Sequence, residues 1–334
     1  MSRHSNISIF IPHIGCPHKC SFCDQRIISG SKNIPHGDDV RRICEQAMQE
    51  IKDRSSTQIA FFGGSFTAVP RDYMLELLTA AREFVGEGKF SGIRISTRPD
   101  FIDREILSIL KSYGVTSIEL GAQSLSDKVL AANERGHSAE DVFKASELIR
   151  EGGFELGLQI IPGLYKSTIE DEQQTIEGVL KIEPDTIRIY PIVVIEGTKL
   201  ADYYKNGEYE LMPFEDMVSL CADMMMQFES NSIRVIKCGL HASDGVEGER
   251  TAGFYHPAFR ELCQGEIYKK EILRLTGGKA GRYDILVGKS HISKAVGHKK
   301  QNIEYFGNLG IEISIKGDDS IPIYKAELRS MRNS

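Results

Sequence analysis

The chain has 334 residues, of which 41% are hydrophobic and 26% are charged, the proportions of an ordinary globular protein. No apolar run approaches the roughly 20 residues that a membrane-spanning helix needs, so we expect no membrane segment. The formal net charge of −6 excludes a surface that attracts polyanions as a whole, and nucleic acid would need a local basic patch. Because the first six residues lack the apolar core of a secretory signal, we expect a cytoplasmic protein.

Short apolar runs typical of strands alternate with amphipathic runs typical of helices, the order expected for βα units around a parallel sheet. The predicted strands are residues 7–11, 58–62, 93–96, 117–120, 155–161 and 186–190. The predicted helices between them are residues 39–52, 71–84, 103–113, 139–150 and 168–182. Six strands in regular repeat favour a barrel over an open doubly wound sheet, although the pattern alone allows both.

The pattern changes after residue 190. A helix is predicted at residues 213–230, a strand at 234–237 and a loop at the glycine-rich and charged stretch 241–250. Further short strands are predicted at 283–287, 311–316 and 321–326, with a hairpin turn at 317–320 between the last two. We therefore predict a larger domain of residues 1–242 and a small C-terminal α+β domain of residues 243–334.

Three cysteines, Cys16, Cys20 and Cys23, lie within eight residues directly after the first predicted strand. Three thiolates on one loop can hold three irons of a [4Fe–4S] cluster and leave the fourth iron open to a ligand. With His13 or His18 the same cysteines could instead form a Cys3His zinc site. Disulfides are disfavoured because the total of seven cysteines is odd and the chain is too long to need them.

The C-x3-C-x2-C spacing, with Phe22 before the last cysteine, resembles the signature of the radical S-adenosylmethionine (SAM) enzymes. That resemblance implies a [4Fe–4S] cluster on Cys16, Cys20 and Cys23, with SAM chelated at the open iron and cleaved reductively to methionine and a 5′-deoxyadenosyl radical. It also implies a partial (β/α)6 barrel with its active site at the carboxyl ends of the strands. A reductase with flavodoxin, or a ferredoxin, is the implied electron donor.

Gly63 and Gly64 end the second predicted strand, where the missing Cβ atoms let the backbone approach a ligand, although a plain turn would use the same residues. In radical SAM proteins a Gly-Gly motif at this place binds the methionyl amino group. Ser65 stands where many members have an acidic residue, and the run from Gly63 to Thr67 resembles Elongator subunit 3. Later strand ends extend this likeness, and one to the oxygen-independent coproporphyrinogen oxidases, from about residue 6 to about residue 240. The acetyltransferase domain of Elongator subunit 3 is not expected in the residues that remain.

Five further residues are assigned to the SAM site. Arg98 offers a planar fork for the SAM carboxylate or a substrate anion. Gln123 can donate and accept hydrogen bonds, which suits a ribose or a carboxylate. Gln159 is assigned by the resemblance. Pro162 and Gly163, which follow Ile161, present apolar surface and open backbone to an adenine ring.

Other residues keep two interpretations. Arg135 and His137 could bind an anion or form the first turn of a helix, and Tyr190 could point into the barrel or into its wall. The remaining cysteines lie singly in the sequence: they are Cys44, Cys221, Cys238 and Cys263. Cys44 and Cys221 lie in predicted amphipathic helices and are expected to be buried thiols, whereas Cys238, beside Gly239, keeps a claim to a role.

Residues 288–300 gather four lysines and two histidines, as a contact with a phosphate backbone requires and as a solvated helix face would also show. Our leading hypothesis is a radical SAM enzyme that modifies a base carbon of RNA, with tRNA in first place, under a C-terminal domain that covers the barrel mouth. The alternatives are a small-molecule or porphyrin-like substrate, and a non-catalytic iron–sulfur or zinc protein. The sequence alone assigns neither a catalytic residue nor an oligomeric state.

Overall fold

The computed structural model describes residues 5–11, 16, 19–24, 27, 33–240 and 248–329. Its largest sheet has seven strands, all parallel to their neighbours, in the order β1-β2-β3-β4-β5-β6-β8. The strands are β1 (Ser5–Ile11), β2 (Thr57–Gly63), β3 (Gly92–Thr97), β4 (Val115–Gln123), β5 (Glu155–Ile160), β6 (Thr186–Ile189) and β8 (Arg234–Cys238). Within the described residues β1 does not pair with β8, so the sheet is a partial barrel. The predicted fold class is confirmed, with β8 added as a seventh parallel strand.

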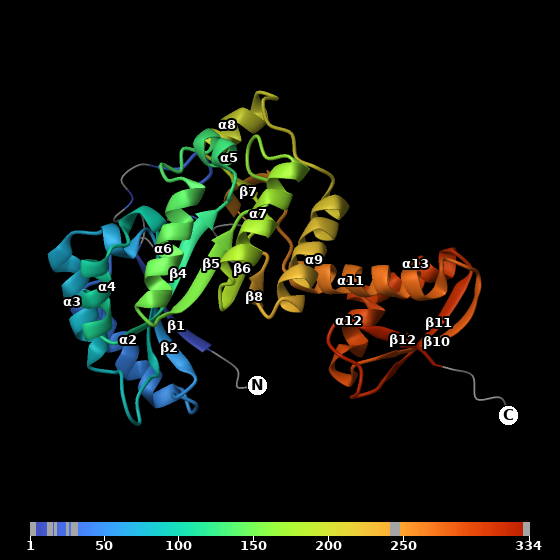
Figure 1. Cartoon of the computed structure of the whole chain (residues 1–334), viewed down its shortest axis with the longest axis horizontal. Coiled ribbons are helices and arrows are strands. Elements are labelled where there is room, and N and C mark those ends of the chain that lie inside the picture. The colour runs from blue at the N-terminus through green and yellow to red at the C-terminus, as the bar shows by residue number, and fades with distance from the viewer. Residues whose placement is uncertain are drawn as a thin grey trace.

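Amphipathic helices connect the strands and cover the outer face of the sheet (Figure 1). They are α2 (Gly37–Glu50), α3 (Arg71–Arg82), α4 (Arg104–Ser112), α6 (Ala139–Glu151), α7 (Ile169–Ile182) and α9 (Phe214–Ser230). Ser138 and Thr168 begin α6 and α7 with reciprocal capping hydrogen bonds. The five predicted crossover helices are therefore confirmed. The sequence prediction did not include the short helices α5 (Asp127–Ala132) and α8 (Lys199–Lys205) or the two-stranded sheet of β7 (Val193–Ile195) and β9 (Arg250–Gly253).

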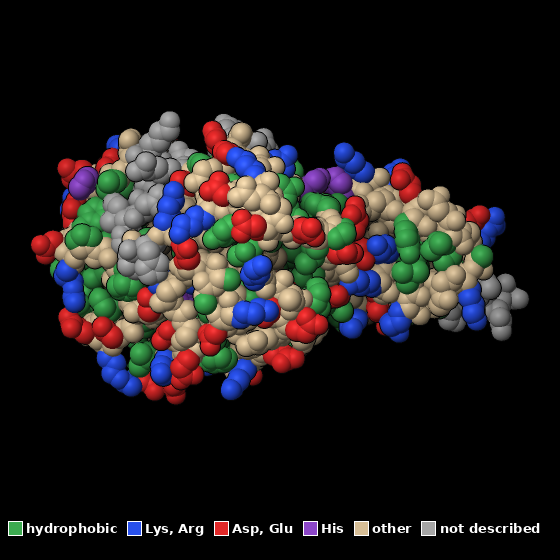
Figure 2. Space-filling view, turned by 90° about the horizontal axis from the view of Figure 1, so that it is seen from above, with side chains coloured by type: hydrophobic (Ala, Val, Ile, Leu, Met, Phe, Trp, Pro, Cys, Tyr) green, Lys and Arg blue, Asp and Glu red, His purple; other side chains and the backbone are tan. Residues whose placement is uncertain are grey.

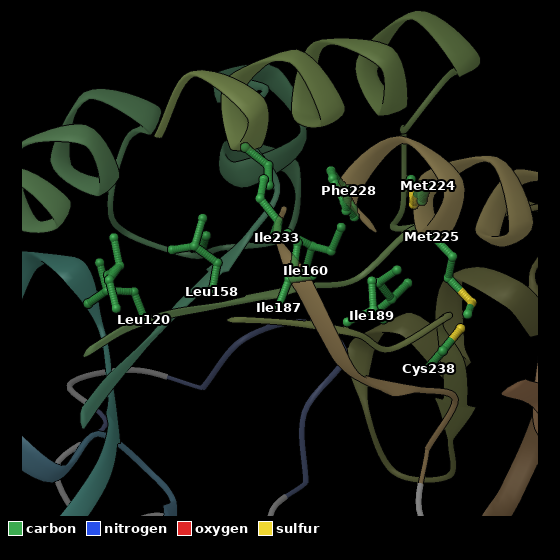
Figure 3. Close-up of a cluster of buried hydrophobic side chains, with 14 of the residues drawn as sticks. Leu120, Leu158, Ile160, Ile187, Ile189, Met224, Met225, Phe228, Ile233 and Cys238 are labelled. Atoms are coloured by element: carbon green, nitrogen blue, oxygen red, sulfur yellow. The ribbon is translucent and has the colours of Figure 1, made fainter. Parts of the chain in front are cut away.

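The core lies where the middle strands meet α9. Side chains from β4, β5 and β6 pack together and against Met224, Met225 and Phe228 of α9 (Figure 3). The strands are largely buried on both faces, and their sequences alternate apolar residues with polar ones such as Arg94, Glu119 and Arg188. Their carboxyl ends are thereby held at one edge of the barrel. Cys238 belongs to this core, with its sulfur 3.9 Å from that of Cys263. All four remaining cysteines are buried, as was predicted for Cys44 and Cys221.

The C-terminal part of the chain forms a smaller lobe beside the barrel, joined to it along α9 and α11 (Phe259–Thr276) (Figure 1). It contains β10 (Gly281–Val287), α12 (Ile292–Val296), α13 (Gln301–Asn308), β11 (Ile311–Gly317) and β12 (Ala326–Leu328). The sheet order is β11-β10-β12. The hairpin predicted at residues 317–320 is therefore wrong, because β10 lies between the two strands that this turn connects.

The apolar core runs without a break from the barrel into the smaller lobe, and it includes Phe259, Ile267 and Ile285. Residues 241–247, where the predicted domain boundary falls, lie outside the described residues, so the division after residue 242 stays a prediction. No helix among the described residues is both long and apolar enough to cross a membrane.

Candidate active site

The three cysteines of the motif follow the carboxyl end of β1, and all three thiols are partly exposed. Cys23 donates its backbone N–H to the carbonyl of Cys20 at 3.2 Å, which closes a tight turn. The backbone N–H of Ser21 donates to the carbonyl of Asn133 at 3.3 Å, and its hydroxyl donates to the Asn133 side chain at 3.1 Å. The turn is thereby tied to the segment that follows α5. His13 and His18, the further ligands of the zinc alternative, lie outside the described residues.

A cavity of about 470 Å³ opens at the carboxyl ends of the strands, and all three cysteines line it. Its lining includes five cationic residues, Lys19, Arg98, Arg135, Arg188 and Lys237, and four aromatic residues, Phe10, Phe22, Phe62 and Tyr190. No Asp or Glu of the described residues is part of the lining. Lys19, Arg98 and Arg188 are each paired with a carboxylate outside the lining, Asp24, Asp100 and Glu119 respectively. The wall therefore offers a ligand guanidinium groups and aromatic faces more than unbalanced charge.

The smaller lobe contributes nothing to this wall. No described residue after 240 lines the cavity, and the lobe lies beside the barrel instead of over its mouth (Figure 1). The expected cover is therefore not seen in the part of the chain that the structure describes. Tyr190 lines the cavity, whereas the sequence alone allowed its side chain to point either into the barrel or into the barrel wall.

Arg135 holds one of the three thiols. Its Nη1 donates to the Cys20 sulfur at 3.0 Å and its Nη2 donates to the Gly121 carbonyl at 2.7 Å, while Nε has no partner among the described residues. Burial and the neighbouring Cys20 raise the pKa of the Cys16 thiol, and the Arg135 and Arg98 guanidiniums oppose that rise. A cation beside thiols favours the thiolate, which is the form that binds metal.

The donor set, three thiols with no carboxylate among the described lining residues, suits a cluster. No three His, Cys, Asp or Glu side chains within the described ranges converge on a point that could hold one metal ion. A zinc ion needs its ligands around one centre, whereas each cysteine of a [4Fe–4S] cube binds its own iron. Three partly exposed thiols that line one cavity, one of them held by the Arg135 guanidinium, therefore fit the cluster.

Gln123 ends β4 in a strained conformation. Its φ is 66°, in the region that favours glycine, and the pairing of β4 with β5 is irregular between Leu120 and Gln123. Its buried side-chain oxygen has no hydrogen-bond donor among the described residues. An unpaired acceptor on a strained residue at a cavity wall is typical of a ligand contact.

Arg98 and Gln159 also line the cavity, but they have protein partners. Arg98 makes a two-pronged ion pair with Asp100 at 2.9 and 2.8 Å. Gln159 donates to Glu119 at 2.7 Å and to Ser96 at 3.2 Å, so its carbonyl oxygen is the group left for a ligand.

The two glycines of the Gly-Gly motif are needed for the close approach of two backbone segments. A Cβ atom on Gly63, whose φ is 102°, would lie 2.6 Å from the Ile11 carbonyl oxygen, and the Gly64 N–H donates to the same oxygen at 2.9 Å. Gly63 is thus required where β2 passes the end of β1, and both glycines still line the cavity. Ser65 does not line it, because its buried hydroxyl lies 2.9 Å from that of Thr97.

Pro162 and Gly163 are not brought to the cavity, and only Ile161 of this turn lines it. The Gly163 N–H donates to Glu172 at 2.8 Å, and its carbonyl accepts from Tyr209. A Cβ atom on Gly163 would lie 2.7 Å from the Met217 methyl group, so this glycine faces α9. The backbone of the turn after β5 therefore faces the barrel wall. For this reason the structure does not support the assignment of Pro162 and Gly163 to an adenine ring.

Glu119 is the main residue of the site that the sequence reasoning missed. It is 1% exposed, and it binds Arg94, Arg188 and Gln159, the last two of which line the cavity. The Arg188 guanidinium also lies 5.2 Å from the centre of the Phe62 ring. A charged residue within an apolar predicted strand was the available signal for this network.

His137 is buried beside the site and does not line it. Its Nε2 lies 3.3 Å from the Ala122 carbonyl, and its Nδ1 has no partner among the described residues. Burial, and then the Arg135 charge, lower the pKa of His137 from 6.5 to about 4. The histidine is therefore neutral in the folded protein near neutral pH.

The free energy of unfolding should fall as the pH is lowered from about 6.5 to about 4, because only the unfolded chain then protonates His137. The pKa of His137 is lower in the folded protein than in the unfolded chain, so the contribution of neutral His137 to stability is complete above the unfolded pKa. The loss should approach 3 kcal/mol, at about 1.4 kcal/mol per pKa unit. Urea unfolding over this range should show a flatter pH dependence for His137→Gln than for wild type, and equal slopes would contradict the assignment.

A parallel partial barrel with three thiols and a cationic cavity at its carboxyl edge defines an iron–sulfur enzyme of the SAM-cleaving class. The chain belongs to the radical SAM superfamily, whose family model matches residues 10–178. A radical SAM C-terminal domain model matches residues 184–269. The cofactors are a [4Fe–4S] cluster and SAM.

Two relatives and one solved structure are similar to this chain. An uncharacterized protein of Methanocaldococcus jannaschii is 31% identical over 225 residues, which cover 64% of this chain and 68% of that protein. A tRNA uridine(34) acetyltransferase of Methanocaldococcus infernus is 25% identical, over 61% of this chain and 46% of the relative. The chain thus spans about half the length of that enzyme. The structure of archaeal M. infernus Elp3 shares the fold, with a TM-score of 0.66, 21% identity and coverage of 88% of this chain and 68% of that one.

Proposed function

We propose that this chain modifies a base of RNA, with tRNA as the first candidate, and that Cys16, Cys20 and Cys23 hold its cluster. The observation that carries the proposal is the cavity in which the three thiols share one wall with five cationic residues and no described acidic residue. When bound, the cluster and SAM supply a 5′-deoxyadenosyl radical that removes hydrogen from an unactivated carbon.

The residues around the thiols suit the polar groups of SAM. The unpaired Gln123 oxygen can accept from a ribose hydroxyl or an amino group, and the Gln159 oxygen is also left to accept. Arg98 is paired with Asp100 through Nε and Nη2, and it can offer its other N–H groups to a carboxylate. Arg135 orients Cys20 through the contact between its Nη1 and the sulfur.

The aromatic residues of the lining suit a nucleotide. Phe10, 37% exposed, lies 6.2 Å from Phe62, and Arg188 covers the Phe62 ring. Aromatic faces and a guanidinium plane are the surfaces on which unpaired RNA bases stack. Lys237, also in the lining, adds positive charge for a phosphate. The relative named as a tRNA uridine(34) acetyltransferase makes tRNA the first RNA to test.

A small anionic molecule with a flat ring system, such as a porphyrin-like compound, is the second candidate. The same cationic and aromatic lining favours it, because ring carboxylates would find the same partners as phosphates. For either substrate, a reductase with flavodoxin, or a ferredoxin, is the proposed electron donor.

The test is transfer of hydrogen from RNA to the cofactor product. Protein reconstituted without oxygen is incubated with SAM, dithionite and tRNA transcribed from nucleotides deuterated at their base carbons. We expect deuterium in 5′-deoxyadenosine and a new base mass in digested tRNA. If RNA neither accelerates 5′-deoxyadenosine formation nor transfers deuterium, while a porphyrin-like compound does, the small-molecule candidate replaces RNA.

A further inference from the structure

The smaller lobe contains a β-α-α-β unit with a short loop between its two helices. β10 leads to α12, residues 297–300 connect α12 to α13, and α13 leads to β11, which pairs in parallel with β10. RNA-binding KH modules clamp about four backbone nucleotides with a Gly-x-x-Gly loop. The loop here reads Gly297, His298, Lys299, Lys300, so the first glycine is present and a lysine takes the place of the second.

Buried contacts hold this loop against α11. The Asn302 side chain, 1% exposed, donates to the Gly265 carbonyl at 2.8 Å and to the Ala295 carbonyl at 3.0 Å. A Cβ atom on Gly265 would lie 3.5 Å from the Gly297 Cα, and one on Gly297 would lie 3.1 Å from the Asn302 nitrogen. The loop therefore approaches α11 closely at two glycines and is fixed by one asparagine.

Both lysines of the loop are held in the left-handed region. The φ angle of Lys299 is 50° and that of Lys300 is 65°, a conformation that glycine adopts freely and L side chains adopt rarely. Lys300 thus reproduces the backbone conformation available to glycine at the fourth position of a Gly-x-x-Gly loop. Such strain persists only where the surroundings impose it, and it is frequent at ligand-binding segments.

The positive charges of residues 288–300 are not equivalent. Lys289 pairs with Asp319, and Lys294, partly buried, lies 3.2 Å from the ring of His291. Lys299 and Lys300 are exposed, and no ion pair to either is found within the described ranges. The two strained residues are therefore also the two available cations.

Apolar and aromatic side chains flank the loop. Val296 and Ile303, on either side of it, are partly exposed, and neither belongs to the core, so they can meet bases. His298 packs edge to face with His256 at 5.5 Å. Figure 2 shows histidine and basic side chains near the place where the two lobes join.

We propose that residues 297–300 grip the phosphate backbone of a single-stranded segment of the RNA substrate, so that the smaller lobe delivers RNA to the barrel. This proposal rests on the proposed function for its choice of RNA. The proposed phosphate contact is limited to Lys299 and Lys300 of this loop and does not involve the whole basic run of residues 288–300.

The test is fluorescence anisotropy with the full chain and a labelled single-stranded RNA of mixed sequence, about 12 nucleotides long, which exceeds the roughly four nucleotides of a KH contact. Lys299→Glu/Lys300→Glu should weaken binding by about tenfold or more and should flatten the log–log salt slope by roughly 1.4 units, at about 0.7 per phosphate. Lys299→Arg/Lys300→Arg should bind like wild type.

The matched control is Lys279→Glu/Lys325→Glu, which makes the same change in charge at exposed sites elsewhere in the lobe. It should change affinity by no more than about twofold, and thermal unfolding midpoints should show that all variants fold. Equal losses in both glutamate pairs, unchanged binding by the loop variant, or no RNA binding by wild type would overturn the proposal.

The loop and the proposed function can fail separately. If single-stranded RNA binds through Lys299 and Lys300 but no RNA transfers deuterium, the proposal for the loop stands and the proposed function is wrong. If RNA transfers deuterium but the loop variant binds RNA like wild type, the proposed function stands and the proposal for the loop is wrong.

Discussion

Replacing Glu119 with alanine should lower the free energy of unfolding by about 3–5 kcal/mol, the cost of breaking a buried ion pair on one side. Glu119 accepts from Arg94 at 3.0 Å and from Arg188 at 2.8 and 2.9 Å, and Arg94 is completely buried. Burial alone raises the pKa of Glu119, but Arg188 and Arg94 more than offset it, so the carboxyl stays ionised. The variant would leave two guanidiniums without their shared carboxylate.

Urea unfolding of Glu119→Ala, with Glu83→Ala as control, measures this effect. Glu83 pairs with Arg41 at 2.9 Å but is half exposed, so solvent screens the pair and its loss should cost much less stability than the loss of Glu119. If Glu119→Ala is as stable as Glu83→Ala, the network inside the barrel contributes no more than a surface pair. The wall that carries Arg188 and Gln159 would then need another explanation.

Cys16→Ala, Cys20→Ala and Cys23→Ala should each abolish binding of the cluster, because each thiolate holds one iron. Wild type reconstituted without oxygen should contain about four irons per chain and show charge-transfer absorption. Cys44→Ala is the matched control, since its thiol is fully buried in α2 and should leave the iron content unchanged. Zinc in protein purified without oxygen, or full iron content in any of the three variants, would contradict the assignment.

The sequence predicts the parts of this molecule that local pattern determines. The predicted strands are short runs rich in Ile, Val, Leu and Phe that alternate with longer amphipathic runs, so six of them could be recognised together with their helices. The three cysteines are close in sequence, so their grouping does not depend on the fold. Gln123 and Arg98 reach the cavity because each lies at a strand end, where the barrel gathers its side chains.

Features that depend on tertiary pairing could not be predicted. Ser65, Pro162 and Gly163 also lie at strand ends, but their partners Thr97 and Glu172 turn them into the wall. The partners of Glu119 come from β3, β5 and β6, so only the strand register reveals them.

The C-terminal lobe shows the same limit. The insertion of β10 between β11 and β12 is a matter of topology that a turn sequence does not report. Lys289 and Lys299 look equivalent in the sequence, yet only the structure shows that Lys289 is paired with Asp319, 30 residues away.

The most direct test of the central claim is the formation of 5′-deoxyadenosine from SAM by wild-type protein under dithionite without oxygen. We predict slow formation without substrate, acceleration by tRNA, and no formation by Cys20→Ala, whose thiol contacts Arg135. Iron-loaded wild type that binds SAM and yields no 5′-deoxyadenosine, with or without RNA, would contradict the account.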